Sequence, residues 1–260
     1  MLFVFLKRNE LELNDALFLQ STGTCCRKPN ELRIVRCKLG AVPHADGSSY
    51  LELGNTKVLV SVFGPYEVRS NHRSKIMSES AFINCQYSMA PFSKQDRRTP
   101  RPRDKKNMEM TINLHQALKS VIRAELLPRT QIDVMVEVLT ADGGNYCAAL
   151  NASTLALIDA GVPLREYVIA CTASLAKGEV PMVDISHLEE TLGGPCLTVA
   201  MLPTSKQIAF TEMSQRFHVD HLEKVMATAQ KGCEDMYKII NNAVRLYFKE
   251  IGFPNNFGQE

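Results

Sequence analysis

The stretch that decides the fold reads Ala141-Asp142-Gly143-Gly144-Asn145-Tyr146-Cys147-Ala148-Ala149-Leu150. It follows residues 130–139, where apolar and polar side chains alternate as in a strand with one buried face. After the two glycines, apolar side chains recur at helical spacing, and Gly161 stands where a helix C-cap is expected. A glycine turn between a strand and a helix presents free backbone N–H groups at the positive end of the helix dipole, which suits a phosphate. An ordinary tight turn is the alternative, because glycine marks turns in general.

The segments on both sides of this turn alternate between strand and helix patterns. Asp46-Gly47 and Gly54-Asn55 are turn dipeptides, and Pro128 follows an amphipathic helix. We expect strands at residues 49–53, 57–63, 82–87, 130–139, 167–175, 196–202 and 207–213. We expect helices at residues 108–127, 146–160 and 220–249. This order predicts an α+β fold of two βαβ-type halves, with helices packed on sheets.

The composition is that of an ordinary globular protein. The chain has 260 residues, of which 45% are hydrophobic and 22% charged, enough for one large domain or two small ones. No apolar run approaches the roughly 20 residues that a membrane span needs. Lys7 and Arg8 follow the apolar start instead of preceding it, so we expect no secretory or mitochondrial signal. Eight cysteines without metal-ligand spacing favour reduced thiols in a cytosolic or nuclear protein.

Further motifs follow one another in order along the chain. They are Glu31-Leu32-Arg33, Ala45-Asp46-Gly47-Ser48-Ser49-Tyr50, Gly54-Asn55-Thr56-Lys57-Val58-Leu59, Phe63-Gly64-Pro65, Asn84-Cys85-Gln86-Tyr87-Ser88, Pro128-Arg129-Thr130-Gln131-Ile132-Asp133, Leu157-Ile158-Asp159-Ala160-Gly161-Val162-Pro163 and Asp184-Ile185-Ser186-His187-Leu188-Glu189-Glu190. Each motif alone is weak. Together with Asp142-Gly143-Gly144, their order and spacing over residues 31–245 resemble the RNase PH family.

The resemblance implies the ribosomal protein S5 domain 2-like fold of that family. It places an RNase PH-like domain at residues 31–250, after a divergent segment at residues 1–30 and before a tail at residues 251–260. The family usually carries Asp-Gly-Arg just before its Glu-Leu-Arg motif. This chain has Cys25-Cys26-Arg27 there and keeps only the arginine. An alternative first exon or a divergent paralogue would each explain the difference.

The resemblance also implies a phosphorolytic 3′–5′ exoribonuclease site, in which phosphate attacks the terminal phosphodiester and releases a nucleoside diphosphate. Two anions must approach each other, so active members place a phosphate-gripping arginine shortly after the Asp-Gly-Gly turn. That position is Tyr146 in this chain, and no other cation lies between Asp142 and Arg165. The backbone part of the phosphate site, Gly143 and Gly144, is therefore kept, while the charged part is missing.

A carboxylate pair is the second requirement, because active members hold a divalent ion with two aspartates six residues apart. The matching positions in this chain are Asp184 and Glu190. Glutamate is longer than aspartate and Mg²⁺ tolerates poor geometry badly, so we expect no cofactor, with residual Mg²⁺ at Asp184 as the alternative. Ordinary acidic residues at the start of a helix would give the same pattern. His187 is interpreted as a local hydrogen-bonding residue instead of a ligand.

A basic loop precedes the helix expected at residues 108–127. Residues 94–106 hold seven basic side chains and two acidic ones, and prolines keep the segment a loop. A solvated loop or a nuclear-localisation signal has the same composition. In the family, the corresponding loop faces a central channel and contacts the RNA backbone. The resemblance therefore implies RNA contacts for Arg97, Arg98, Arg101, Arg103, Lys105 and Lys106. RNA contact and plain solvation are both open for Arg69 and Arg73, in a loop that lines the channel constriction of relatives.

The resemblance as a whole implies a non-catalytic ring subunit of the RNA exosome that supports 3′–5′ RNA processing and decay, including rRNA maturation and mRNA turnover. The expected partners are RNA, other RNase PH-like subunits in a six-membered ring, S1/KH cap subunits and a separate hydrolytic nuclease, with no membrane. The expected compartments are the nucleus, the nucleolus and the cytoplasm. Two alternatives are an active phosphate-dependent 3′–5′ exoribonuclease and a divergent paralogue outside the ring.

Overall fold

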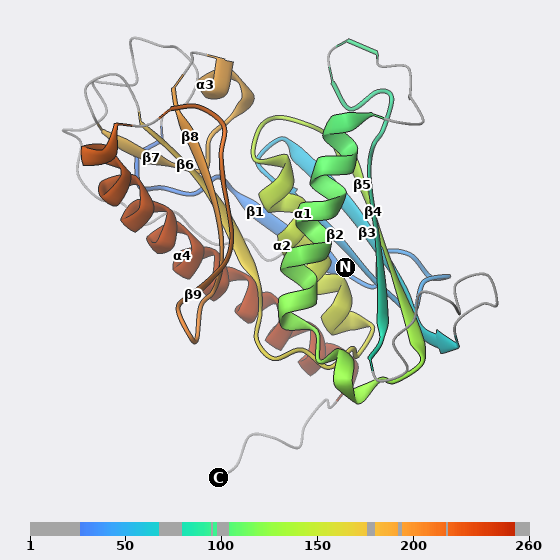
Figure 1. The fold of residues 1–260 in the computed structure, drawn as a ribbon. Helices are drawn as coiled ribbons and strands as arrows, with labels where there is room; N and C mark the ends of the chain where they lie inside the picture. Colours follow the sequence, from blue (N-terminus) through green and yellow to red (C-terminus); the bar gives the residue numbers. More distant parts are fainter. Residues whose placement is uncertain are drawn as a thin grey trace.

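Two β-sheets with helices packed against them form the fold (Figure 1). The computed structural model describes residues 27–67, 80–94, 96–97, 104–175, 180–191, 194–216 and 218–252. None of the helices in these ranges is long and apolar enough to cross a membrane. The mixture of strands and helices agrees with the α+β fold that the sequence predicts.

The first sheet contains the predicted βαβ unit. Its five strands are β1 (Val35–Leu39), β2 (Gly47–Leu53), β3 (Thr56–Glu67), β4 (Phe82–Met89) and β5 (Thr130–Thr140), in the order β1-β2-β3-β5-β4. Burial alternates along β3 and β5, because every second side chain faces the core. Strands β4 and β5 are parallel and are joined through α1 (Lys105–Val121). Helices α1 and α2 (Asn145–Asp159) lie on one face of this sheet (Figure 1).

Helix α1 begins and ends earlier than its sequence pattern predicts. Its N-cap is Asp104, whose side chain accepts a hydrogen bond from a backbone N–H of the first turn. The helix ends at Val121, although the periodicity continues to residue 127, because Ile122 is extended and pairs with Leu164. A short 3₁₀ helix, Ala124–Leu126, completes the connection to β5. Tertiary pairing overrides the helical pattern at this point.

The second sheet differs from the predicted second βαβ unit. Its strands are β6 (Ile169–Leu175), β7 (Pro181–Val183), β8 (Cys196–Leu202) and β9 (Gln207–Met213), in the order β7-β6-β8-β9, and every pair is antiparallel. The β8–β9 hairpin has the bounds that the sequence predicts. A short helix, α3 (His187–Thr191), follows β7, and the long helix α4 (Val219–Gly252) packs along the sheet (Figure 1).

Helix α2 lies between the two sheets and forms the centre of the core. It contacts β2 and β3 of the first sheet and β6 of the second. Every residue from 146 to 157 is buried, including three polar ones. Asn151 exchanges hydrogen bonds with the backbone of Ala170, and the Thr154 hydroxyl donates to Val168 O at 2.8 Å. These bonds hold α2 against the second sheet, and the Ser49 hydroxyl of β2 donates to Ala152 O at 2.6 Å from the first sheet. The turn at the start of α2 therefore has a fixed position between the two sheets.

Candidate functional site

The turn between β5 and α2 needs glycine at both of its central positions. Gly143 has φ 80° and Gly144, the N-cap of α2, has φ 62°, a left-handed backbone that favours glycine. A Cβ on Gly143 would lie 2.6 Å from Ile185 O and 2.7 Å from His187 N. Both of these atoms belong to the backbone and cannot move aside. The turn therefore packs directly against the loop that leads from β7 into α3.

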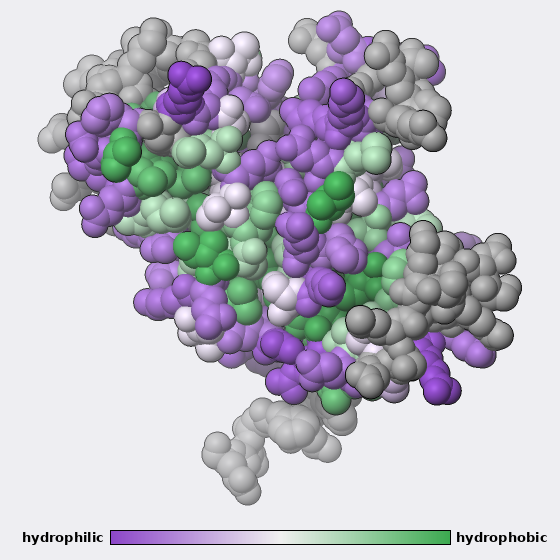
Figure 2. Space-filling model, viewed as in Figure 1, coloured by the Kyte–Doolittle hydropathy of each residue, from purple (hydrophilic) through white to green (hydrophobic). Residues whose placement is uncertain are grey.

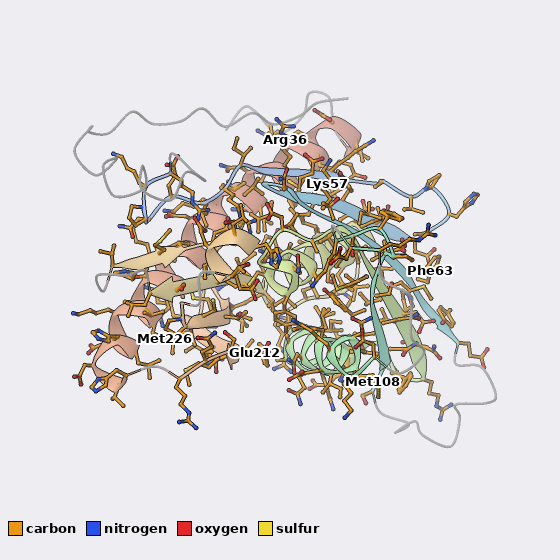
Figure 3. All side chains as sticks on the ribbon, turned by 90° about the horizontal axis from the view of Figure 1, so that it is seen from above. Arg36, Lys57, Phe63, Met108, Glu212 and Met226 are labelled. Carbon is orange, nitrogen blue, oxygen red and sulfur yellow. The ribbon has the colours of Figure 1, made fainter. Side chains whose placement is uncertain are left out.

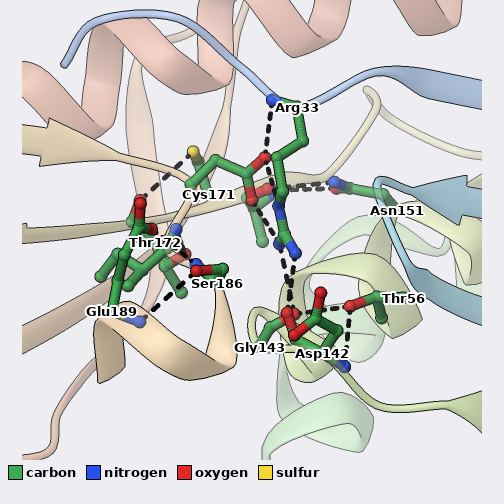
Figure 4. Close-up of polar contacts among 12 residues, drawn as sticks. Arg33, Thr56, Asp142, Gly143, Asn151, Cys171, Thr172, Ser186 and Glu189 are labelled. Atoms are coloured by element: carbon green, nitrogen blue, oxygen red, sulfur yellow. Dashed lines mark hydrogen bonds and ion pairs between the residues drawn. The ribbon is translucent and has the colours of Figure 1, made fainter. Parts of the chain in front are cut away.

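The carbonyl groups of this turn are held by two side chains from the first half of the chain (Figure 4). The Thr56 hydroxyl donates to Gly143 O at 2.8 Å and accepts from Asp142 N at 3.2 Å. Arg33 Nη1 donates to Asp142 O at 2.8 Å, and Nη2 donates to Gly143 O at 3.2 Å. The first N–H groups of α2 have no partner inside the helix, and Gly144, Asn145 and Tyr146 line the adjoining cleft.

Arg33 also forms a buried ion pair with Asp184 (Figure 4). Nε donates to Asp184 Oδ2 at 3.0 Å, Nη2 donates to Oδ1 at 2.7 Å, and the backbone N–H of Arg33 donates to Oδ2 at 3.0 Å. The side chains are 8% and 2% exposed. Burial alone lowers the pKa of Arg33, but the hydrogen bonds and charge of Asp184 outweigh it, so this pKa is raised. The guanidinium is therefore a fixed positive charge that spans both carboxylate oxygens.

A second arginine extends this network to α3. Arg27 Nη1 donates to Asp184 O at 2.7 Å, and Nη2 donates to Glu189 Oε2 at 3.0 Å. The Glu189 carboxylate also accepts from Ser186 N at 2.8 Å. The sequence identified Arg27 and Arg33 as parts of motifs but assigned neither a role. Because each reaches Asp184 across about 150 residues of sequence, no local pattern reveals these contacts.

A cleft of about 500 Å³ opens beside the turn, between the two halves. Its walls come from the start of α1, the start of α2, the end of β4, the start of β8, and β9. Charged residues of both signs line it: Lys94, Lys105, Lys106, Glu109, Glu190 and Glu212. Figure 2 shows the space between the lobe that carries α3 and the N-terminal end of α1 bordered mainly by hydrophilic side chains.

Tyr146, which the family resemblance matches to the phosphate-gripping arginine, forms part of this cleft. Its side chain is 5% exposed, and its ring lies 5.3 Å from the ring of Phe210, at 55°. The hydroxyl is buried and has no hydrogen-bond partner among the residues that the structure describes. Burial, with smaller contributions from Cys147 and Glu212, raises the pKa of Tyr146 far above its ordinary value. The first turn of α2 therefore presents a neutral aromatic side chain.

Glu212 brings a carboxylate to the same wall. It lies on β9 beside α1 (Figure 3). Its pKa is raised, first by burial and then by the nearby Glu109, while Lys106 opposes the shift. Sequence reasoning missed both Phe210 and Glu212, because β9 is more than 60 residues from the Gly-Gly turn and carries no motif. The sequence predicts the β8–β9 hairpin but does not indicate that β9 borders the cleft.

Asp184 and Glu190, the positions that match the family's carboxylate pair, have different partners in the structure. Both oxygens of Asp184 accept hydrogen bonds from Arg33, whereas Glu190 lines the cleft and lies 3.8 Å from His187 Nδ1. Within the described ranges, no group of three or more histidine, cysteine or acidic residues is arranged to hold a metal ion. A divalent ion needs several free oxygen ligands in good geometry. The side chains present do not fit the metal that the family resemblance implies.

The predicted RNA-binding residues are only partly described. Lys105 and Lys106 are exposed at the rim of the cleft, together with Lys94 at the other end of the basic loop. Arg97 is also exposed. Arg98, Arg101, Arg103, Arg69 and Arg73 lie outside the described residues. The ends of the basic loop thus border the same cleft as Tyr146.

Comparison with known proteins shows which family and which relatives this chain is similar to. The 3′ exoribonuclease family, domain 1, matches residues 31–163, and domain 2 of the same family matches residues 166–232. Exosome complex component RRP41 of Homo sapiens is 44% identical over 224 residues, which are 86% of this chain and 91% of that protein. The RRP41 homolog of Arabidopsis thaliana is 35% identical, over 87% of this chain and 93% of that protein. The crystal structure of rice (Oryza sativa) Rrp46 superposes with a TM-score of 0.76 at 21% identity, covering 86% of this chain and 99% of that one.

Proposed function

The chain belongs to the RNase PH family of 3′ exoribonucleases, and we propose that it is a non-catalytic ring subunit of the RNA exosome. The two relatives reported above are named as exosome components, and the match covers most of their length. In this role the chain scaffolds a ring of RNase PH-like subunits and lines the channel through which RNA passes. RNA, S1/KH cap subunits and a hydrolytic nuclease are the proposed partners, in the nucleus, the nucleolus and the cytoplasm.

The side chain at position 146 carries the non-catalytic part of the proposal. Phosphorolysis needs a cation that holds the attacking phosphate against a second phosphate. At the first turn of α2 the chain has the neutral Tyr146, packed on Phe210. The Arg33–Asp184 pair supports the same conclusion, because Asp184 already has a permanent cationic partner. A phosphate-dependent RNA degradation assay tests the proposal directly.

We expect the chain to need a ring partner for solubility. Strands β1, β4, β7 and β9 end the two sheets, and large apolar side chains are exposed at several places, among them Phe92, Ile208, Met213 and Val219. Unpaired strands and exposed apolar surface promote association. Expressed alone, the chain should self-associate or precipitate. Co-expressed with a complementary RNase PH-like subunit, it should elute as a heterodimer in size-exclusion chromatography with light scattering. A soluble monomer that binds no such subunit would contradict the ring assignment.

We expect the basic loop to contact the RNA backbone without sequence preference. The Arg97→Ala/Arg98→Ala variant of the reconstituted ring should bind all single-stranded RNAs more weakly than wild type. The log–log salt slope should fall by roughly 0.7 for each RNA phosphate that the variant no longer neutralises, because fewer counterions are released. RNA affinity at several salt concentrations measures both effects.

The matched control variant removes two positive charges outside the basic loop. Lys224 and Lys231 are exposed on α4, which packs along the second sheet away from the basic loop. The Lys224→Ala/Lys231→Ala variant should keep the wild-type affinity and slope. Equal losses in the two double variants would mean that net charge alone attracts RNA and that the loop has no special role.

A further inference from the structure

Three side-chain oxygens at the cleft are buried and have no hydrogen-bond partner among the described residues. They are Asn107 Oδ1, Asn145 Oδ1 and the Tyr146 hydroxyl oxygen. All three residues line the cleft, and the Tyr146 side chain is only 5% exposed. A buried polar atom without a partner is unfavourable. Three of them beside one cleft therefore indicate a site for a ligand that bonds to them.

The groups at this site are acceptors of hydrogen bonds. An amide Oδ1 only accepts, and a tyrosine hydroxyl both accepts and donates. Two carboxylates of the cleft, Glu109 on α1 and Glu212 on β9, add further acceptors and negative charge. They are near enough to each other that Glu109 adds to the effect of burial and raises the pKa of Glu212. A ligand that complements these groups is a cation with several N–H donors.

The lysines of the cleft do not take this place. Lys94, Lys105 and Lys106 are exposed at its rim. None of the ion pairs in the described part of the chain joins them to Glu109 or Glu212. Lys106 lowers the pKa of Glu212, but burial and Glu109 outweigh this effect and the pKa is raised. The Glu212 carboxylate is therefore still poorly compensated in the cleft.

A guanidinium group matches these acceptors better than an ammonium group does. It is planar, stays charged and carries five N–H donors, whereas an ammonium group carries three. It is also more weakly hydrated, so it loses less on entering a partly buried site, and it stacks on aromatic rings. Tyr87 and Tyr146 both line the cleft. The volume of about 500 Å³ accommodates the group together with an alkyl chain.

We propose that the cleft beside the Gly-Gly turn binds the guanidinium group of an alkylguanidine. Glu109 and Glu212 are its counter-ions. Asn107, Asn145 and the Tyr146 hydroxyl accept its remaining N–H groups. Binding of this kind requires no catalysis by the chain, so the inference goes beyond the proposed function and does not rest on it.

Butylguanidine and butylamine are matched probes for this site, because they differ only in the charged head group. A ligand-observed NMR titration measures both dissociation constants, with the full-length chain alone where it is soluble and otherwise as the co-expressed heterodimer. Butylguanidine should bind about tenfold more tightly than butylamine, since it forms more charge-assisted hydrogen bonds. Equal affinities would overturn the assignment of a guanidinium ligand.

A third probe identifies the source of the group. Nα-acetyl-arginine amide carries the guanidinium on a peptide backbone. If it binds as tightly as butylguanidine, the site accepts the arginine side chain of a protein. If only butylguanidine binds, the site is specific for a free alkylguanidine. Both results support a guanidinium site, whereas a failure of both probes to bind would overturn it.

Variants of the cleft assign the binding to the proposed residues. Glu212→Gln keeps the shape of the side chain and removes its charge, so it should weaken butylguanidine binding about tenfold. Glu109→Gln, at an exposed position of α1, should weaken it less, and it tests the site even if Glu212→Gln does not fold. Tyr146→Arg places a guanidinium of the chain itself beside Glu212 and should abolish binding of the probe. Glu223→Gln, on the exposed face of α4, should bind like wild type.

Two results with these variants would overturn the proposal. The first is equal binding by wild type, Glu212→Gln and Glu109→Gln. The second is an equal loss in Glu212→Gln and Glu223→Gln, because net charge alone would then attract the probe. The readout is binding of the probe, so neither result depends on whether the chain degrades RNA or joins a ring.

Discussion

The purified chain is expected to release no nucleoside diphosphate from poly(A) in the presence of Mg²⁺ and phosphate. The missing cation at position 146 is the main reason, because losing one charged group that stabilises a transition state typically costs on the order of 10²–10³-fold in rate. The second reason is Asp184, whose carboxylate oxygens are both bonded to Arg33. The measurement is chromatography of the released nucleotides, with the chain alone and with its ring partner. A phosphorolytic member of the family serves as the positive control.

Two variants of position 146 separate charge from shape in this experiment. Tyr146→Arg supplies the missing cation beside Glu212, and it should bind inorganic phosphate more tightly than wild type does. Tyr146→Phe removes only a hydroxyl that has no partner among the described residues, so it should behave like wild type. Equal phosphate binding by both variants would mean that the missing charge is not what prevents binding at the turn.

RNA degradation by the wild-type chain would contradict the non-catalytic proposal if the degradation requires both phosphate and the cleft. Glu190→Gln tests the dependence on the cleft, because Glu190 lines it and is 52% exposed, so the fold should tolerate the change. Glu223→Gln is the matched control on the exposed face of α4. Phosphate-dependent release that disappears in Glu190→Gln and persists in Glu223→Gln would establish an active site in this chain.

Sequence patterns predict the elements of this fold well wherever one face of an element is buried. The alternation at residues 130–139 becomes β5, and the β8–β9 hairpin has its predicted bounds. Two differences arise from contacts between distant segments. Pairing of Ile122 with Leu164 ends α1 early, and the second sheet is antiparallel throughout, where a βαβ unit was expected. Local periodicity contains no information on either contact.

The candidate site is predictable only in part, for a similar reason. The Gly-Gly turn and the neutral Tyr146 can be read from the sequence, because they are neighbours in the chain. The residues that contact them cannot be read from the sequence, because Phe210 comes from β9 and Arg33 comes from the segment before β1. The family resemblance predicts that a positive charge is missing at position 146. In the structure, the ring of Tyr146 packs against Phe210 at this position, and the carboxylate of Glu212 lies close to it.

The Arg33–Asp184 pair joins these two observations, because one guanidinium holds both the Gly-Gly turn and the aspartate that matches the family's carboxylate pair. Arg33 bonds to Asp142 O and Gly143 O on one side and to the Asp184 carboxylate on the other. It therefore connects the start of α2 to the loop before α3, across the boundary between the two sheets. A cation in this place neutralises the buried Asp184 carboxylate, both of whose oxygens accept hydrogen bonds from Arg33. We infer that these hydrogen bonds of Arg33 hold the two sheets together.

Removing one partner of this pair is expected to cost about 3–5 kcal/mol of unfolding free energy, because an unpaired charge would be left buried. Arg33→Met leaves the Asp184 carboxylate without its cation, and Asp184→Asn leaves the guanidinium without its anion. Asparagine suits position 184, whose φ of 56° is left-handed, so the second variant changes charge without adding backbone strain. The measurement is the shift of the urea midpoint at constant slope.

The double variant Arg33→Met/Asp184→Asn should lose less stability than the two single losses added together, because neither charge then stays buried without its partner. The control is Arg165→Met, which removes an exposed ion pair whose Nη2–Oε1 distance to Glu125 is 3.4 Å. Exposed pairs contribute under about 1 kcal/mol, so this variant should unfold close to wild type. A loss in Arg33→Met no larger than in Arg165→Met would show that the buried pair does not hold the two halves together.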